Sequence, residues 1–359
     1  LLFGDSGSDR FDPAGPRAAP AASGGRRQIG GARRRVFCDF NGLDQARRSH
    51  RRDAGGRVSA PRRIIPGSTY LVSRRCIERK YLLRPDPAVT STFLYCLAYA
   101  ADATGIQLHG FMVLSNHFHL CLTDPDARLP EFMHRLDGLL ARALNAFRGR
   151  WECFFAPGSY SEVRLVSDED VLNKLVYLLT NPVAAGLVSH SRRWTGASSR
   201  NWSFGEARTF QRPSGSFFKP DGCMPDTARL VLKVPPALRH LSRAEADRVV
   251  TDRVVARETE IRAKFRSEGR EFLGEDAVMR VEPNASPNSR EPRRTLDPTL
   301  AAADHDERVA AIKELQEFRA AHREAWQLWR AGKHSAVFPW GTYLMRVRYG
   351  VSCRPPPPS

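Results

Sequence analysis

The chain has 359 residues, 26% of them charged, and no run of the roughly 18 apolar residues that a membrane span requires, so we expect a cytoplasmic protein without membrane contact. Its seven cysteines are scattered and form no Cys-x-x-Cys pair, which argues against a disulfide framework and against a zinc site built from cysteines. The net charge of +17, with an isoelectric point of about 10.2, favours a polyanionic partner, and nucleic acid is the first candidate.

Residues 1–63 hold 14 arginines and six aspartates but no lysine or glutamate, which gives them a net charge of +8. This stretch is rich in Gly, Ala and Pro and lacks a sustained hydrophobic period, so we expect a disordered Arg-rich segment over residues 1–61. Two interpretations stay open, a basic arm that binds DNA and a translated leader without function.

The ordered part is expected to begin near Ile64. Hydrophobic periods predict alternating strands and helices at residues 69–76 (strand), 89–104 (helix), 111–123 (strand), 129–148 (helix), 162–166 (strand) and 168–181 (helix). This order indicates an α+β protein, a ferredoxin-like (RRM-like) sandwich in which helices pack on an antiparallel sheet.

Residues 211–359 differ in character. They hold two further predicted helices, at 243–268 and 304–331, and between them a Pro/Asn/Arg-rich linker near 281–299. No catalytic motif is recognisable there, and charged helices usually have simple solvated faces. We therefore interpret this part as a helical accessory region.

The second predicted strand carries two imidazoles, His117 and His119, two positions apart. Side chains alternate along a strand, so both rings are expected on one face, together with Ser115 and Cys121. The other face is apolar and consists of Met112, Leu114, Phe118, Leu120 and Leu122. Neutral imidazoles commonly bind divalent metals, and two on a rigid strand suit a metal with open positions for a substrate. Hydrogen-bonded structural histidines are the alternative, and His109 is interpreted as structural.

The last helix of this domain has a well-marked start and end. Ser167 supplies an N-cap hydroxyl before an acidic first turn, and Pro182 indicates an end at about Asn181. One side of the helix is an apolar stripe. The other side is polar at i, i+3 and i+4 spacing and consists of Asp170, Asn173, Lys174, Tyr177 and Asn181. Tyr177 therefore stands on the polar side, one turn from both Lys174 and Asn181.

Two segments form an unusual combination, NHFHL at 116–120 and LVYLLTNPVAAGLV at 175–188, with supporting segments PGSTYLVSR at 66–74 and WTGASS at 194–199. Together they resemble the single-tyrosine HUH transposases, particularly the REP-associated tyrosine transposases. The resemblance covers roughly residues 62–200, and we assign residues 62–210 to an HUH single-tyrosine domain. The chain departs from many relatives at Leu71, where they have a histidine, and at Ala184-Ala185, where they have an arginine.

The resemblance implies a metal-dependent DNA enzyme. In that family two histidines bind Mg²⁺ or Mn²⁺ and a helix tyrosine attacks DNA. His117 and His119 fall on the metal pair, Tyr177 falls on the nucleophile, and Asn181 falls on an amide-type third ligand. The implied activity is cleavage and rejoining of single-stranded or hairpin DNA through a 5′-phosphotyrosine, by a bacterial protein that is on the nucleoid when bound to DNA. A non-cutting DNA-binding regulator of its own element and an HUH replication initiator or relaxase stay open.

Basic side chains near the two motifs are candidates for contacts with the DNA backbone. They are Lys174, Arg135, Arg142, Arg148 and Arg150. A simply solvated side chain is the alternative for Lys174. Tyr160 is the rival nucleophile, although its Pro-Gly-Ser loop positions it less rigidly than a helix would. A homodimer is compatible with the resemblance.

Overall fold

The computed structural model describes residues 60–158, 160–215, 217–289 and 298–357. From Arg63 onward the described residues belong to one compact unit. The segment predicted to be disordered over residues 1–61 lies outside the described residues except at its very end. In the described ranges, no helix is both long enough and apolar enough to cross a membrane.

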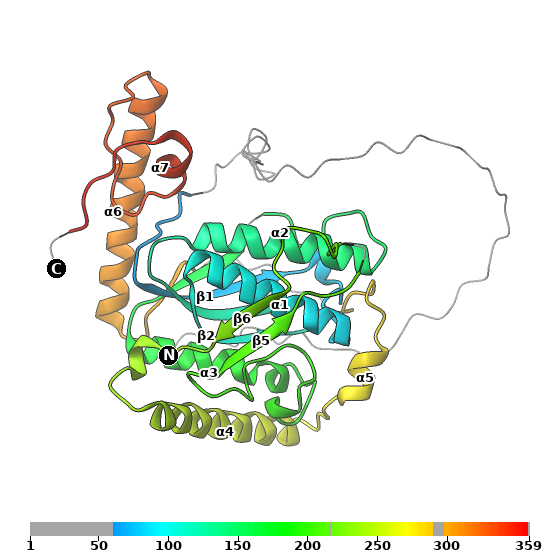
Figure 1. Cartoon of the computed structure of the whole chain (residues 1–359). Helices are drawn as coiled ribbons and strands as arrows, with labels where there is room; N and C mark the ends of the chain where they lie inside the picture. Colours follow the sequence, from blue (N-terminus) through cyan, green and yellow to red (C-terminus); the bar gives the residue numbers. More distant parts are fainter. Residues whose placement is uncertain (1–59, 159, 216, 290–297, 358–359) are drawn as a thin grey trace, which may run out of the picture. The chain divides into compact units, whose positions relative to one another are not determined.

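A β-α-β-β-α-β unit forms the centre of the structure (Figure 1). Its elements are β1 (Ser68–Arg75), α1 (Pro87–Thr104), β2 (Gln107–Val113), β3 (His117–Asp124), α2 (Leu129–Phe147) and β4 (Ser161–Leu165). The four strands are antiparallel in the order β2-β3-β1-β4, and β7 (Leu300–Ala301) adds to β4 in parallel. This is the ferredoxin-like α+β sandwich predicted from the sequence.

The stretch 111–123, predicted as one strand, is instead a hairpin formed by β2 and β3. The amide of Leu114 donates to the carbonyl of His117 at 2.9 Å, which closes the turn. In this hairpin Met112 pairs with His119, so their side chains lie on the same face of the sheet. The prediction that Met112 lies on the other face from the imidazoles was wrong. Within β3 the alternation holds, with Phe118 on one face and both histidines on the other.

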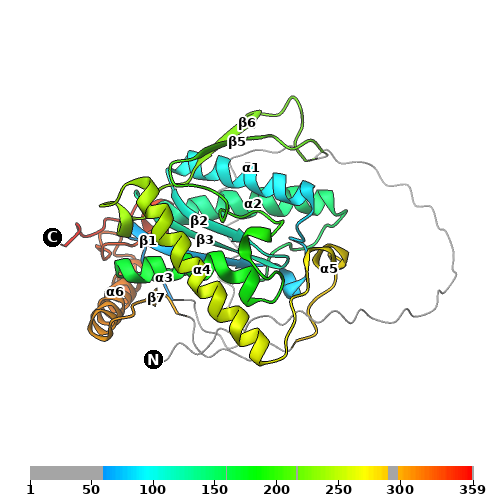
Figure 2. The same cartoon turned by 90° about the horizontal axis from the view of Figure 1, so that it is seen from below.

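Different helices cover the two faces of the sheet. α1 and α2 pack together on the face of Phe118, whose ring lies 5.2 Å from that of Phe93 in α1. α3 (Asp168–Ala184) packs against β2 and β3 on the opposite face, and α4 (Arg243–Ser267) covers α3 in turn (Figure 2). The histidine face of β3 therefore lies beneath a helix.

α3 begins as predicted but ends later than predicted. Ser167 and Asp170 form a reciprocal capping box at its start. The helix continues through Pro182 to Ala184. Pro182 costs the helix only one amide donor, and the next residue, Val183, is fully buried in the core. Gly186 follows the C-cap residue Ala185, and its φ of 75° and its hydrogen bond to the Val183 carbonyl belong to a Schellman motif that stops the helix.

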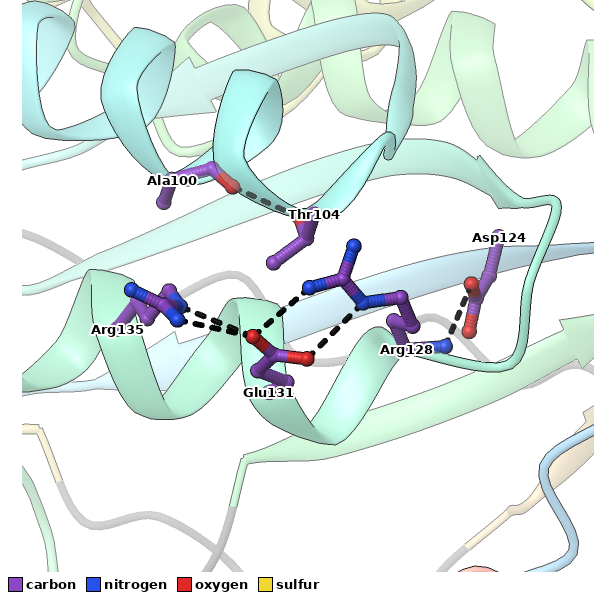
Figure 3. Close-up of polar contacts among 6 residues, drawn as sticks. All are labelled: Ala100, Thr104, Asp124, Arg128, Glu131 and Arg135. Carbon is purple, nitrogen blue, oxygen red and sulfur yellow. Dashed lines mark hydrogen bonds and ion pairs between the residues drawn. The ribbon is translucent and has the colours of Figure 1, made fainter.

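The carboxylate of Asp124 fixes the start of α2 (Figure 3). It accepts a hydrogen bond from the backbone amide of Arg128 at 2.8 Å. It also accepts one from the backbone amide of Leu129 at 2.7 Å. Glu131 in the first turn then binds both Arg128 and Arg135. The end of β3 and the start of α2 are thus joined by one side chain.

The region after residue 210 contains the predicted helices and also strands that the sequence did not indicate. β5 (Ala207–Gln211) and β6 (Thr227–Val231) form an antiparallel hairpin that contacts α1. The helices include α4 and α6 (His305–Arg330), which match the predictions within one residue at each end. Shorter helices in this region are α5 (Glu275–Arg280), α7 (Leu344–Tyr349) and the 3₁₀ turn Pro236–Leu238. Two further 3₁₀ turns, Ile77–Arg79 and Ser191–Arg193, lie earlier in the chain.

α3 lies close to the sheet at Gly110. A Cβ atom on Gly110 would lie 2.5 Å from Cδ1 of Leu175, whose side chain is buried between the helix and the sheet. The glycine therefore allows α3 to lie directly against the backbone of β2.

We predict that Gly110→Ala lowers the free energy of unfolding by about 1–3 kcal/mol, because an added methyl group overpacks this contact. Urea denaturation measures the change. Gly138→Ala is the matched control, since a Cβ on Gly138 in α2 meets only Nη2 of Arg142 at 3.8 Å. This control should raise the unfolding free energy by up to about 1 kcal/mol through helix propensity. Stabilisation by both substitutions would contradict the close contact.

Candidate active site

The two imidazoles of β3 lie against one another on the face that α3 covers. Their ring centroids are 4.8 Å apart and the ring planes meet at 85°. His119 is buried, with 8% of its surface exposed, and His117 is partly buried. The predicted placement on one face is thus the observed one.

Each imidazole is held through its Nδ1 atom. Nδ1 of His117 lies 2.6 Å from Oδ1 of Asn116, and Nδ1 of His119 lies 2.6 Å from Oγ of Ser73 in β1. An amide oxygen can only accept, so His117 carries its proton on Nδ1 and keeps the lone pair on Nε2. A histidine whose second nitrogen is fixed in this way is typical of metal sites.

Both imidazoles are neutral near pH 7. Burial lowers the pKa of His117 to about 3, and the positive charges of Arg75 and Arg79 act in the same direction. Burial and the neighbouring His117 hold the pKa of His119 well below its ordinary value. Neutral imidazole is the form that binds a metal.

Tyr177 reaches this pair from α3. Its ring centroid lies 5.7 Å from that of His119, at an interplanar angle of 72°. Nζ of Lys174 lies 5.7 Å from the centre of the tyrosine ring, one turn back along the helix. Burial lowers the pKa of Lys174, so this side chain is not the simply solvated lysine that the sequence left as an alternative.

Asn181 follows one turn after Tyr177 and is buried, with 8% of its surface exposed. Its backbone carbonyl accepts a hydrogen bond from Ala185, which continues the helix. Its contribution to a metal site stays a prediction. In the part of the chain that the structure describes, no group of three or more His, Cys, Asp or Glu side chains could hold a metal ion.

The donor set fits a divalent ion that keeps open positions. Two neutral imidazoles with fixed orientation supply nitrogen ligands, and the remaining positions would fall to an amide, water or phosphate oxygens. The fit rests on the paired Nδ1 contacts of His117 and His119.

His109 and Tyr160 have other surroundings. His109 contacts Oγ1 of Thr123 at 2.7 Å and the carbonyl of Lys233 at 3.0 Å, which confirms its structural role. Tyr160 is buried in the hydrophobic core, with 8% of its surface exposed, whereas Tyr177 is only partly buried. Of the two tyrosines, Tyr177 is the one beside the imidazoles.

The arginines proposed as DNA contacts are engaged within the protein. Arg135 pairs with Glu131 at 3.0 Å, and Arg142 lies over the ring of Phe217 at 5.5 Å. Arg150 donates to Oδ1 of Asn284 at 2.7 Å. Arg148 requires a correction, because its side chain is 7% exposed and pairs with Asp86 at 2.7 Å. It lies in an internal ion pair rather than on the surface.

Sequence analysis did not identify Ser73 and Arg75 as parts of this site. Both belong to β1, and their relation to the histidines follows from the pairing of Ser73 with His119 and Arg75 with His117. Ser73 lies in the supporting segment at 66–74 and Arg75 directly follows it, but only the strand register shows that both lie beside the histidines.

Comparisons with known proteins give partial structural matches. No protein-family model matches the chain, and no curated protein sequence matches it at a significant level. The structure of a REP-associated tyrosine transposase bound to a REP hairpin aligns with 39% of this chain and 81% of its own, at 17% identity and a TM-score of 0.34. A putative transposase from Deinococcus radiodurans R1 aligns with 29% of this chain and 84% of its own, at 20% identity and a TM-score of 0.24.

The chain is thus similar to transposases. One of the two matched proteins belongs to the group that the sequence motifs resemble. At these TM-scores the alignments carry no argument about chemistry, which rests on the geometry of the site.

Protonation of His109 should make the stability of the protein depend on pH. Burial lowers its pKa to about 4 in the folded chain, against about 6.5 in an unfolded chain. Between these values the unfolded chain binds a proton that the folded chain does not, so stability is lost as the pH falls. We predict that His109→Gln reduces this loss by about 1 kcal/mol per pH unit between pH 6 and 5, measured by urea denaturation with EDTA present.

The control for this measurement is His305→Gln, which removes an exposed imidazole at the start of α6. Wild type, control and His109→Gln are compared at the same urea concentrations. Identical pH slopes for wild type and His109→Gln would contradict the assignment of His109 as a buried neutral group.

Proposed function

We propose that this chain is a metal-assisted tyrosine transposase that cleaves and rejoins single-stranded or hairpin DNA through a 5′-phosphotyrosine. The observation that supports it is the placement of the Tyr177 ring 5.7 Å from the His119 ring, which lies 4.8 Å from the His117 ring. A hydroxyl nucleophile and two neutral imidazoles are therefore held together by a helix and a strand.

His117 and His119 would hold the metal, with the Asn181 amide as the proposed third ligand. When bound, Mg²⁺ or Mn²⁺ supplies polarisation of a non-bridging oxygen of the scissile phosphate. The residues around it bind and orient the DNA.

Positive side chains lie near the imidazoles and near the proposed nucleophile. Arg75 and Arg79 act electrostatically on His117, and Lys174 lies over the ring of Tyr177. These charges attract a phosphate group. The site is thus suited to a negatively charged substrate.

The covalent step conserves the energy of the broken bond. The Tyr177 oxygen loses its proton and bonds to phosphorus, while the bond from phosphorus to the 3′ oxygen breaks and that oxygen takes up a proton. The products are a 5′-phosphotyrosine and a free 3′-hydroxyl. Attack by a 3′-hydroxyl on the phosphotyrosine reverses the step and rejoins the strand.

Hairpin or single-stranded DNA is the substrate that we propose. The similar REP-associated tyrosine transposase is bound to a REP hairpin.

We predict that Tyr177→Phe abolishes covalent attachment to DNA and retains fold and DNA binding, because it removes one oxygen and leaves the ring to pack. The protein is incubated with labelled hairpin DNA and Mg²⁺, and a denaturing gel reveals a protein–DNA adduct. Tyr160→Phe is the matched control and should form the adduct as the wild type does. Adduct formation by Tyr177→Phe at the wild-type rate would place the nucleophile elsewhere.

The same assay tests the metal. His117→Ala should also lose the adduct, and excess Mn²⁺ should partly restore it there but never in Tyr177→Phe. Failure of the wild type to form an adduct on many hairpins would favour a non-cutting regulator that binds DNA without cleaving it.

A further inference from the structure

Positive charge is concentrated at the end of the chain. Residues 319–359 contain seven basic side chains and one acidic side chain, a net charge of +6. Residues 64–318 contain 35 basic and 32 acidic side chains, a net charge of only +3. Such an asymmetry is typical of a surface that binds a polyanion.

These charges stand on an ordered scaffold, which we call the C-terminal module and define as residues 319–354. It comprises the second half of α6, a loop, α7 beside it and the segment that follows (Figure 1). Its own hydrophobic cluster consists of Ala325, Phe338, Met345 and Val351. Phe338 donates to the carbonyl of Ser352 and accepts from the amide of Arg354, both at 2.8 Å, which ties the last segment to the loop. The cations are thus held in fixed positions.

Three exposed arginines of the C-terminal module lack acidic partners among the described residues. Arg323, Arg330 and Arg346 are exposed, and none of the three forms an ion pair with a carboxylate among the described residues. On α4, by contrast, Arg253 pairs with Glu169 at 2.8 Å and Arg257 pairs with Glu260 at 2.9 Å. The negative end of the α6 dipole stabilises a positive charge only at Arg330, which lies in the last turn of that helix.

Aromatic rings lie between these cations. The ring of Tyr349 is 48% exposed and stands 4.9 Å from that of Trp329, and Arg348 lies over it at 5.4 Å. The guanidinium of Arg330 lies over Trp326 at 4.8 Å. Arginines interleaved with partly open aromatic rings are the composition of surfaces on which single-stranded bases stack.

We propose that the C-terminal module is a second DNA-binding surface, which holds single-stranded DNA outside the segment that is cleaved. Phosphates contact Arg323, Arg330 and Arg346, and a base stacks on Tyr349. The inference rests on the proposed function in taking DNA as the polyanion. It adds a surface that is separate in sequence and in core packing from the tyrosine site.

The test compares two triple variants of the full chain in a Tyr177→Phe background, so that no covalent step contributes to binding. The first is Arg323→Gln with Arg330→Gln and Arg346→Gln. The control is Arg193→Gln with Arg253→Gln and Arg257→Gln, which removes the same charge from arginines that are paired with Glu275, Glu169 and Glu260. Binding of a labelled hairpin with a single-stranded tail is measured by fluorescence anisotropy across a range of salt concentrations.

The first variant should reduce the slope of log affinity against log salt by about 2, because each phosphate contact on a single strand contributes about 0.7. The control should keep the wild-type slope. Tyr349→Leu should weaken binding of the tailed hairpin about tenfold and leave binding of a blunt duplex unchanged, since only unpaired bases stack on the ring. Circular dichroism confirms that the variants fold.

Three outcomes would overturn the inference. They are an unchanged slope in the first variant, an equal change in both triple variants, and binding of the module to anionic phospholipid vesicles with the DNA slope unaffected. If the wild type forms no adduct, the proposed cleavage is wrong. The comparison of the two triple variants still tests the second surface, because affinity is measured without cleavage. Adduct formation with an unchanged slope would defeat only the second surface.

Discussion

The packing of α3 onto the histidine face of the sheet is the contact on which the proposed site depends. Gly110 allows the helix to approach the backbone of β2, and the Ser167 cap fixes where the helix begins. Tyr177 consequently lies beside His119. Burial beneath this helix also keeps the imidazoles neutral, so one contact sets both the position of the proposed nucleophile and the charge of the proposed metal ligands.

Much of the fold could be predicted because several elements have a strong period of their own. α2 buries one apolar face, and its bounds follow from that pattern and from clear ends. α4 was predicted as a charged helix, and its buried face against α3 was not. The β2–β3 hairpin could not be found in this way, since the turn residues Leu114, Ser115 and Asn116 include neither Gly nor Pro. The carbonyls of Ser115 and Asn116 are bound by amides at residues 83 and 76, which are distant in sequence.

The site was predictable only where it is local. His117 and His119 share a face because both lie in one short strand, and Tyr177 and Lys174 share a face because they are one helical turn apart. Arg148 shows the limit of such reasoning. Its spacing on α2 suggested a surface cation, but its partner Asp86 precedes α1, and only the tertiary structure brings the two together. The metal ligands and the chemistry of Tyr177 stay proposals.

The order of the elements along the chain has a consequence for biosynthesis. α4 covers α3, and β7 completes the edge of the sheet beside β4, yet both are made long after the elements that they cover. During translation, a free strand edge and an apolar helix face therefore remain without their partners, and such surfaces promote association between chains. At ordinary rates of synthesis the interval between residue 184 and residue 301 lasts roughly 10 s. A nascent chain of this protein is consequently a candidate client for chaperones that shield exposed apolar surface near the ribosome.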